Sequence, residues 1–190
     1  MKIGVLAIQG DFDAHRRRLE ELGAEVVLIR KPEQLAAIEG LVLPGGESTT
    51  FLKFLERDGF LEKLRDFVRS KPVFGTCAGA ILLAQEVTNP PQEALGALDI
   101  RICRNAYGRQ LESSIRSGET TLPGGPLELV FIRAPRIERV GSGVEVLARE
   151  GGDPVLVRSG KVMAATFHPE LSADPRVHAA FLDLARNGAH

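Results

Sequence analysis

The sequence has few cysteines and no long hydrophobic run. Among its 190 residues only Cys77 and Cys103 are cysteines. Two are too few for a disulfide framework, and such sparse use is typical of a reducing compartment, where a thiol stays free. No apolar stretch approaches the ~18 residues of a membrane span, and the apolar opening, which ends before Asp11, is too short for a signal segment. We therefore expect a cytoplasmic protein.

An excess of charge of one sign is also missing. The 24 Lys and Arg residues nearly balance the 25 Asp and Glu residues, which leaves a formal net charge of −1. This balance gives no general attraction to nucleic acid or anionic lipid, so we expect neither as a partner and look for local sites. A chain of this length can bury a core without disulfides or a structural metal, and we expect residues 1–190 to form one domain.

The first hundred residues alternate short apolar runs with amphipathic segments. Continuous apolar runs are typical of strands buried on both faces, and the segments between them have helical periodicity. The expected strands are 2–8, 24–29, 41–44 and 71–75, and the expected helices are 13–23, 32–38 and 48–70, the last broken near Gly59. This alternation predicts a parallel sheet with helices on both faces and ligands at the carboxyl ends of its strands.

From about residue 95 the pattern changes to short β-like pieces separated by Gly and Pro turns. These pieces are 97–102, 127–134, 144–148, 154–160 and 161–167. We expect some of them to be antiparallel. An amphipathic helix over 174–188 then closes the chain, with Asp174 as N-cap, Pro175 at the first helical position and Gly188 after its end. The expected fold class is α/β, with a mostly parallel sheet and antiparallel strands in the C-terminal half.

The segment GTCAGA places Cys77 between two glycines where an expected strand enters a helix. G-x-C-x-G is similar in form to the nucleophile elbow G-x-S-x-G, in which small flanking residues allow a sharp turn. The partial positive charge at a helix N-terminus favours a thiolate there. The plain alternative is a buried cysteine in a tight turn, but strand, glycines and helix together favour a nucleophile.

A thiolate nucleophile needs a histidine to handle its proton and a group that orients this histidine. His168 directly follows the expected strand 161–167 and precedes Pro169, which favours extended backbone in the residue before it. In an extended segment Glu170 projects to the same side as His168. We therefore predict a triad of Cys77, His168 and Glu170. The other histidines are expected to be exposed: His15, His178 and His190.

The segment LPGGEST presents the backbone N–H groups of Gly45 and Gly46 ahead of a helix that we expect Ser48 to cap. Such groups bind a phosphate, a carboxylate or a developing oxyanion. A phosphate is disfavoured because the segment lacks the Lys of a P-loop and contains Glu47. A simple turn with a helix cap is the plain alternative. Beside a nucleophile, we expect an oxyanion hole formed by the N–H groups of Gly46 and Ala78.

Taken together, these segments resemble the class I (triad) glutamine amidotransferases, and within them the glutaminase subunits of pyridoxal 5′-phosphate synthases. The resemblance runs from end to end and rests on IGVLAIQGD, LPGGESTT, FGTCAGAILLA, RNAYGRQ (104–110), FIRAP (131–135) and FHPEL (167–171). Other members of the class are similar at G-x-C-x-G and HPE, so the narrower resemblance depends on GGESTT, RNAYGRQ and FIRAP. It implies a three-layer, flavodoxin-like fold.

The resemblance implies that Cys77 attacks the side-chain amide of L-glutamine, that His168 protonates the departing ammonia and that Glu170 orients His168. A γ-glutamyl thioester forms, and water then releases L-glutamate. Gln9 is implied to lie near the oxyanion hole. The residues implied to bind glutamine are Gly46, Glu47, Ser48, Arg104, Ile132 and Arg133. No metal or cofactor is implied.

Elementary chemistry agrees with this set, because a free amino acid needs a cation or N–H groups for its α-carboxylate and an acceptor for its ammonium group. Arg104 or Arg133 suits the α-carboxylate, and Glu47 or a backbone carbonyl suits the ammonium group. Solvated surface arginines are the plain alternative for both.

The resemblance also implies a partner, the (β/α)₈ synthase subunit, which takes up the ammonia within a large hetero-oligomer. Glutaminase activity is then implied to stay low until docking completes the oxyanion hole. The run 15–18 is either part of the docking surface or, as we favour, a solvated helix face.

Three alternatives stay open: the glutaminase subunit of a different amidotransferase, a cysteine-elbow protein of the related protease and chaperone group, and a non-catalytic module that binds glutamine. Ala78 counts against the second, because there a histidine often follows the elbow cysteine.

Overall fold

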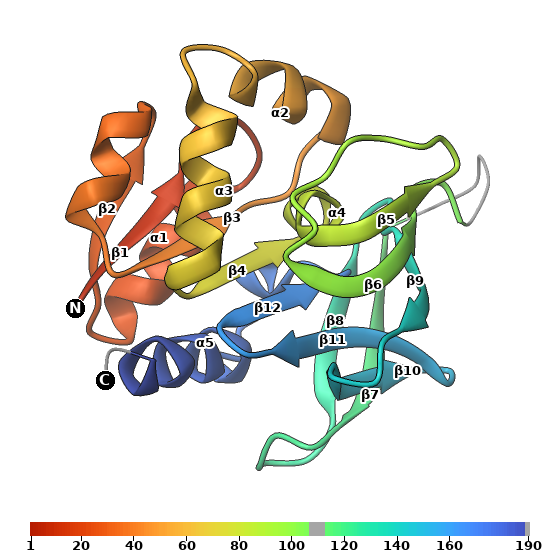
Figure 1. Cartoon of the computed structure of the whole chain (residues 1–190). Helices are drawn as coiled ribbons and strands as arrows, with labels where there is room; N and C mark the ends of the chain where they lie inside the picture. The colour runs from red at the N-terminus through yellow and green to blue at the C-terminus, as the bar shows by residue number, and fades with distance from the viewer. Residues whose placement is uncertain (107–112, 189–190) are drawn as a thin grey trace.

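The computed structural model describes residues 1–106 and 113–188 (Figure 1). Most of the RNAYGRQ segment and His190 therefore lie outside the described residues. The parallel half of the large sheet consists, in spatial order, of β2 (Glu25–Ile29), β1 (Lys2–Leu6), β3 (Gly40–Leu43), β4 (Val73–Thr76) and β12 (Val162–Ala165). With β12 counted as the fifth parallel strand, this is the 2-1-3-4-5 order of flavodoxin-like folds. Ligands of such sheets bind at the carboxyl edge where the strand order reverses.

The antiparallel part continues from β12. It consists of β11 (Asp153–Ser159), β10 (Glu145–Glu150), β7 (Ser114–Thr120) and β8 (Leu127–Phe131). A second, smaller sheet consists of β5 (Ala84–Thr88), β6 (Leu98–Cys103) and β9 (Arg136–Val140). The prediction of antiparallel strands in the C-terminal half is confirmed, whereas β5, β7 and β9 were not among the expected strands.

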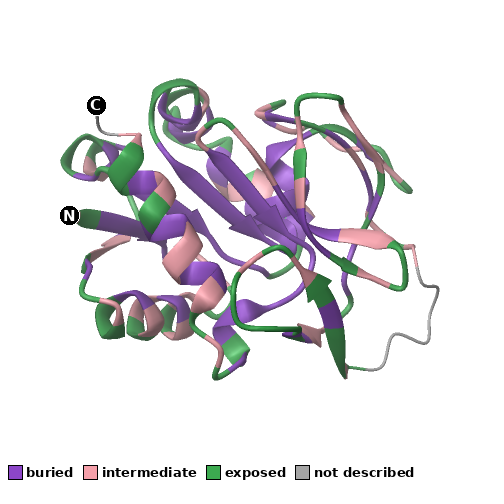
Figure 2. Ribbon diagram, turned by 90° about the horizontal axis from the view of Figure 1, so that it is seen from below, coloured by how far each residue is buried: buried purple, intermediate pink, exposed green. Residues whose placement is uncertain are grey.

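Helices cover both faces of the large sheet (Figure 1). One face carries α1 (Phe12–Glu21) and α5 (Arg176–Asn187), and the other carries α2 (Ser48–Leu55), α3 (Phe60–Ser70), α4 (Ala78–Leu83) and the 3₁₀ helix η1 (Pro32–Ala37). The side chains of β3 alternate between two cores: Leu41 and Leu43 pack with α2, α3 and α4, and Val42 with α1 and α5. Figure 2 shows the central strands buried between helices whose outer faces are exposed. The expected α/β class with helices on both faces is confirmed.

Some element boundaries differ from the sequence-based expectation. The 32–38 segment is a 3₁₀ helix, and α5 begins at Arg176 with Pro175 in the N-cap position. Asp174 still helps to start α5, because its Oδ1 accepts a hydrogen bond of 3.0 Å from the backbone N–H of Arg176. Gly59 separates α2 from α3 with φ of 72°, a left-handed conformation that favours glycine. None of the helices in the described ranges has the length and apolar character to cross a bilayer.

Candidate active site

Cys77 forms a strained turn between β4 and α4. Its φ of 51° and ψ of −107° are unusual for a residue with a side chain, and such strain is found at nucleophile elbows. The backbone N–H of Cys77 donates to the carbonyl of Ala165 over 2.9 Å, which holds the elbow against the end of β12. The cysteine side chain is buried, at 7% exposure.

The two glycines of the elbow are required by close backbone approach. A Cβ at Gly75 would lie 2.5 Å from the backbone of Gly79, and a Cβ at Gly79 would lie 2.0 Å from the carbonyl oxygen of Leu43. Real Cβ atoms essentially never come that close to backbone. The glycines therefore allow α4 to start directly over β3 and β4, with Cys77 at the carboxyl edge of the sheet.

His168 and Glu170 form a buried pair beside this elbow. Nδ1 of His168 donates to Oε1 of Glu170 over 2.6 Å, and both residues are only 6% exposed. They meet across a turn rather than along a strand, because β12 ends at Ala165 and Glu170 lies in the 3₁₀ helix η2 (Pro169–Leu171). A Cβ added at Gly45 would touch both His168 Cε1 and Cys77 Cβ, so these two side chains border the same point.

The environment of His168 favours its charged form. Burial lowers the pKa of His168, but its interactions with Cys77 and Glu170 raise the pKa to about 10. An imidazolium is thus the stable form near neutral pH. Its Nε2 is buried and makes no hydrogen bond within the described chain, so this N–H is free to serve a reacting group.

The glycine-rich loop after β3 lies against the loop after β1. Gly46 has φ of 132°, and a Cβ there would lie 2.5 Å from Nε2 of Gln9. Nε2 of Gln9 donates to the backbone carbonyl of Glu47 over 2.9 Å. Because β1 and β3 are the strands between which the order of the sheet reverses, this contact lies at the crevice where the fold predicts a ligand.

Glu47, not Ser48, caps α2. The carboxylate of Glu47 accepts hydrogen bonds from the backbone N–H groups of Thr49 and Thr50 at 2.9 and 2.7 Å. Partial burial would raise the pKa of Glu47, but these hydrogen bonds lower it to about 2. Oγ of Ser48 instead donates to the side-chain oxygen of Gln92 over 3.1 Å. The expectation of a Ser48 cap was wrong, because α2 begins at Ser48 and Glu47 therefore occupies the N-cap position.

Arg104, which follows β6, joins this loop. Its Nη2 donates to Oγ1 of Thr49 over 2.8 Å and lies 3.5 Å from Oε1 of Glu47. The guanidinium is mostly buried, with 14% of the side chain exposed, so it is not a solvated surface group. Arg104, Glu47 and Ser48 therefore occupy one region, as expected for a common binding site.

Ile132 and Arg133 follow β8, which is tied to the His168 segment. The backbone N–H of His168 donates to the carbonyl of Val130 over 2.8 Å. Arg133 is exposed and has φ of 44°, a left-handed conformation unusual for arginine. The end of β8, just before Ile132 and Arg133, is thus bonded to the segment that carries the His–Glu pair.

The expectation that His15 and His178 are exposed was wrong. Both are completely buried, at 0% exposure, between α1 and α5. The charged residues around His15 made α1 look solvated, but His15 and Leu19, four residues apart, share its inward face. The periodicity of this helix was the signal that could have identified the buried histidine.

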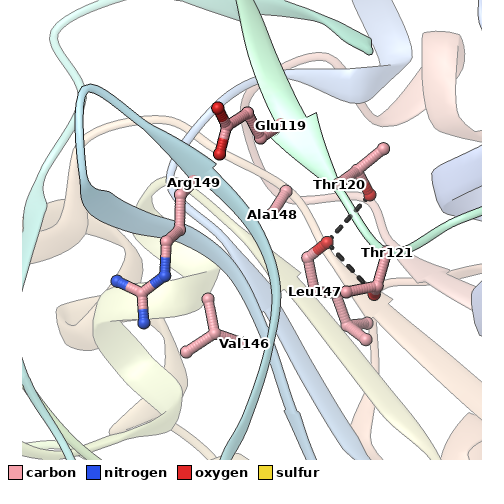
Figure 3. Close-up of a pocket in the computed structure, with 7 residues that line it drawn as sticks. All are labelled: Glu119, Thr120, Thr121, Val146, Leu147, Ala148 and Arg149. Carbon is pink, nitrogen blue, oxygen red and sulfur yellow. Dashed lines mark hydrogen bonds between the residues drawn. The ribbon is translucent and has the colours of Figure 1, made fainter. Parts of the chain in front are cut away.

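A surface pocket of about 230 Å³ lies away from the predicted site, between β7 and β10 (Figure 3). The hydroxyl groups of Thr120 and Thr121 donate to the carbonyl of Leu147 there, at 2.8 and 3.4 Å. None of the predicted site residues lines this pocket. Across residues 1–106 and 113–188, no group of three or more His, Cys, Asp or Glu side chains is placed to hold a metal ion.

This combination of fold and site defines the class I glutamine amidotransferases. Comparison with protein families agrees with the geometry: the chain belongs to the SNO glutamine amidotransferase family, whose model matches residues 5–186. A solved crystal structure of a glutamine amidotransferase is 50% identical, with a TM-score of 0.90 over 97% of this chain and 98% of that one.

Two curated relatives are similar along almost their whole length. The pyridoxal 5′-phosphate synthase subunit PdxT of Koribacter versatilis is 69% identical over 188 residues, which cover 99% of this chain and 97% of that protein. The subunit of the same name from Solibacter usitatus is 54% identical over 187 residues, which cover 95% and 97%.

Proposed function

We propose that this chain is the glutaminase subunit of a pyridoxal 5′-phosphate synthase and hydrolyses L-glutamine to L-glutamate and ammonia. The observation that carries the proposal is the elbow cysteine beside a buried His168–Glu170 pair, in a chain 69% identical to a PdxT subunit. The residue roles below follow from this geometry and from the chemistry of amide hydrolysis.

In the first half-reaction the thiolate of Cys77 attacks the side-chain carbonyl carbon of glutamine. The new C–S bond pushes the carbonyl electrons onto oxygen, and the N–H groups of Gly46 and Ala78, with Gln9 beside them, stabilise this oxyanion. His168 Nε2–H gives its proton to the amide nitrogen as the C–N bond breaks. Ammonia leaves and a γ-glutamyl thioester remains on Cys77.

In the second half-reaction water attacks the thioester. His168, now neutral, takes a proton from this water, and collapse of the intermediate releases L-glutamate and restores the thiolate. Glu170 keeps Nδ1–H of His168 hydrogen-bonded through both steps, so that Nε2 always faces the reacting atoms.

We assign the binding of glutamine itself to Gly46, Glu47, Ser48, Arg104, Ile132 and Arg133. Arg104 suits the α-carboxylate because it is mostly buried, whereas Arg133 is exposed. The carboxylate of Glu47 already accepts three hydrogen bonds and borders Arg104. We therefore propose that Glu47 holds the loop and Arg104 in place, and that a backbone carbonyl receives the ammonium group.

The partner in this proposal is the (β/α)₈ synthase subunit, which consumes the ammonia within a large hetero-oligomer. A chain that only released ammonia to water would have no biosynthetic use for it. We further propose that residues 1–190 form one glutaminase domain, because the large sheet draws strands from Lys2 to Ala165. The free thiols of Cys77 and Cys103 support a cytoplasmic location.

The test is to mix the protein with synthase subunits and to measure glutamate release and glutamine-dependent formation of pyridoxal 5′-phosphate. Cys77→Ala should abolish both while glutamine still binds. Cys103→Ala is the matched control, because Cys103 is the other buried free cysteine and has no proposed role in the chemistry.

Glutamate release by Cys77→Ala would refute the assigned nucleophile. If glutamine-dependent product formed only with the synthase subunit of another amidotransferase, the proposed partner would be wrong, but the proposed hydrolysis of glutamine would stand. Tight glutamine binding without turnover by the wild type in any complex would favour the regulatory module instead.

A further inference from the structure

Two buried histidines lie directly behind the proposed triad and have no role in the mechanism above. His15 belongs to α1 and His178 to α5, and their ring centroids are 5.1 Å apart. Nδ1 of His15 and Nε2 of His178 share a hydrogen bond of 2.8 Å. Fully buried imidazoles are uncommon, and each polar atom in such a place needs a partner.

The other ring nitrogen of His15 reaches both catalytic segments. Its Nε2 lies 3.2 Å from Oγ1 of Thr76, the residue before Cys77, and 3.4 Å from Oε2 of Glu170. Oε1 of Glu170 is bonded to His168, but Oε2 is buried and has no hydrogen-bond partner of good geometry. His15 is thus the polar group that approaches the unsatisfied oxygen of Glu170.

The proton positions follow from charge. Burial is the largest cause, and the proximity of the His178 and His168 imidazoles adds to it, in lowering the pKa of His15 well below its ordinary value, so His15 is neutral and carries one N–H. A bare Nε2 lone pair facing a buried carboxylate would be repelled in a medium of low dielectric. Nε2–H therefore faces Thr76 and Glu170, and Nδ1 of His15 must accept a hydrogen bond.

This tautomer in turn fixes His178. Burial and the charge of Arg18 lower the pKa of His178 to about 3, so it too is neutral. Its Nε2–H must donate to Nδ1 of His15, which leaves its own Nδ1 as a bare acceptor. That nitrogen is the one without a partner in the described chain, and an unpaired lone pair is easier to bury than an unpaired N–H.

We propose that His15 is a positioning residue for the triad: its Nε2–H holds the second oxygen of Glu170, and His178 holds His15 in the tautomer that permits this. The inference rests on the proposed glutaminase function. One directed series of N–H groups then runs from α5 through α1 toward the triad: His178 donates to His15, and His15 faces Glu170.

Loss of this donor acts on the orientation of Glu170. Oε1 of Glu170 accepts a hydrogen bond from His168, and Oε2 faces Nε2 of His15 at 3.4 Å. Without the N–H of His15, this buried and charged oxygen lies beside no donor, so the carboxylate is less firmly held and His168 loses its fixed orientation. The loss should therefore appear in kcat rather than in KM.

The experiment measures kcat and KM with the synthase subunit present, for His15→Leu, His15→Gln and Leu19→Ala. His15→Leu should lower kcat by about 10- to 100-fold, since a donor to a charged group is lost, with KM little changed. His15→Gln, whose amide N–H can replace this donor, should recover part of the lost kcat. Leu19→Ala opens the same helix core and should leave kcat close to that of the wild type.

A kcat of His15→Leu equal to that of the wild type, or equal losses in all three variants, would overturn the proposal and assign His15 to packing. A second measurement does not depend on activity: ¹⁵N NMR of the imidazoles in the resting protein should show Nε2–H on His15 and on His178. Nδ1–H on His15 would also overturn it. Failure of the wild type to hydrolyse glutamine would instead refute the proposed function and leave the NMR result standing.

Discussion

Gly79→Ala tests whether the close approach of α4 to β3 is what positions the nucleophile. The added Cβ would lie 2.0 Å from the carbonyl oxygen and 2.8 Å from the carbonyl carbon of Leu43, where ordinary contact begins at 3.4 Å. Both obstructing atoms are backbone atoms of a strand paired on two sides, so neither can rotate away. The start of α4, with Cys77 and Ala78, must move instead.

The size of the effect follows from overpacking. Extra methyl groups in a well-packed core cost about 1–3 kcal/mol, and we expect the upper end because backbone is in the way. In a chain of this length each kcal/mol lowers the melting temperature by about 2–4 °C, so Gly79→Ala should melt about 6–12 °C lower. A displacement of the elbow by about 1 Å should also reduce turnover about 100-fold.

The assay pairs thermal unfolding followed by circular dichroism with glutamate release in the presence of the synthase subunit. Gly143→Ala is the matched control, because a Cβ at Gly143 meets no atom within 4 Å, and it should change neither quantity. If Gly79→Ala has the melting temperature and the turnover of the wild type, the reasoning from close approach is refuted.

Three further changes test the ionisable groups of the site. Burial lowers the pKa of His168, but Cys77 and Glu170 raise it to about 10, so its stabilisation of the fold is complete below the ordinary 6.5 and is lost as the pH rises toward 10. The difference in melting temperature between wild type and His168→Gln should shrink over that range, and a constant difference would contradict it. Glu47→Ala should lower the free energy of unfolding in urea by about 1 kcal/mol through loss of the helix cap. Because the pKa of Glu47 is lowered from 4.5 to about 2, that difference should persist above pH 4.5 and fade as the pH drops toward 2. Arg104→Met should raise KM for glutamine about 10- to 100-fold with a smaller change in kcat, and an unchanged KM would place the carboxylate elsewhere.

The elbow and the alternation of strands and helices around it could be predicted because their signals are local. A buried strand, two glycines and a following helix specify the turn at Cys77 within six residues. The pairing of His168 with Glu170 was also predicted, although the 3₁₀ turn that joins them was not. Pro169 lies between the two residues and restricts the backbone. His168 and Glu170 therefore meet across the observed 3₁₀ turn, as they were expected to meet along an extended segment.

Other features depend on contacts that no short segment records. β7 is exposed over most of its length, and its seven residues lack a buried alternate face, so only its pairing with β8 and β10 makes it a strand. His15 and His178 are 163 positions apart in the chain, and their burial depends on α1 lying beside α5. Their shared hydrogen bond becomes visible only when the fold brings these helices together.

The strands that carry the proposed triad and the glycine-rich loop are interior strands. β1, β3, β4 and β12 each have a neighbour on both sides, whereas the outermost strands of the described sheet are β2 and β8. Backbone that is paired on both sides opens only when most of a molecule opens, while fraying begins at margins. Fraying of β2, the margin that carries none of the proposed site residues, should therefore leave the catalytic chemistry intact. Heat or denaturant should abolish activity in the same cooperative step that unfolds the interior strands.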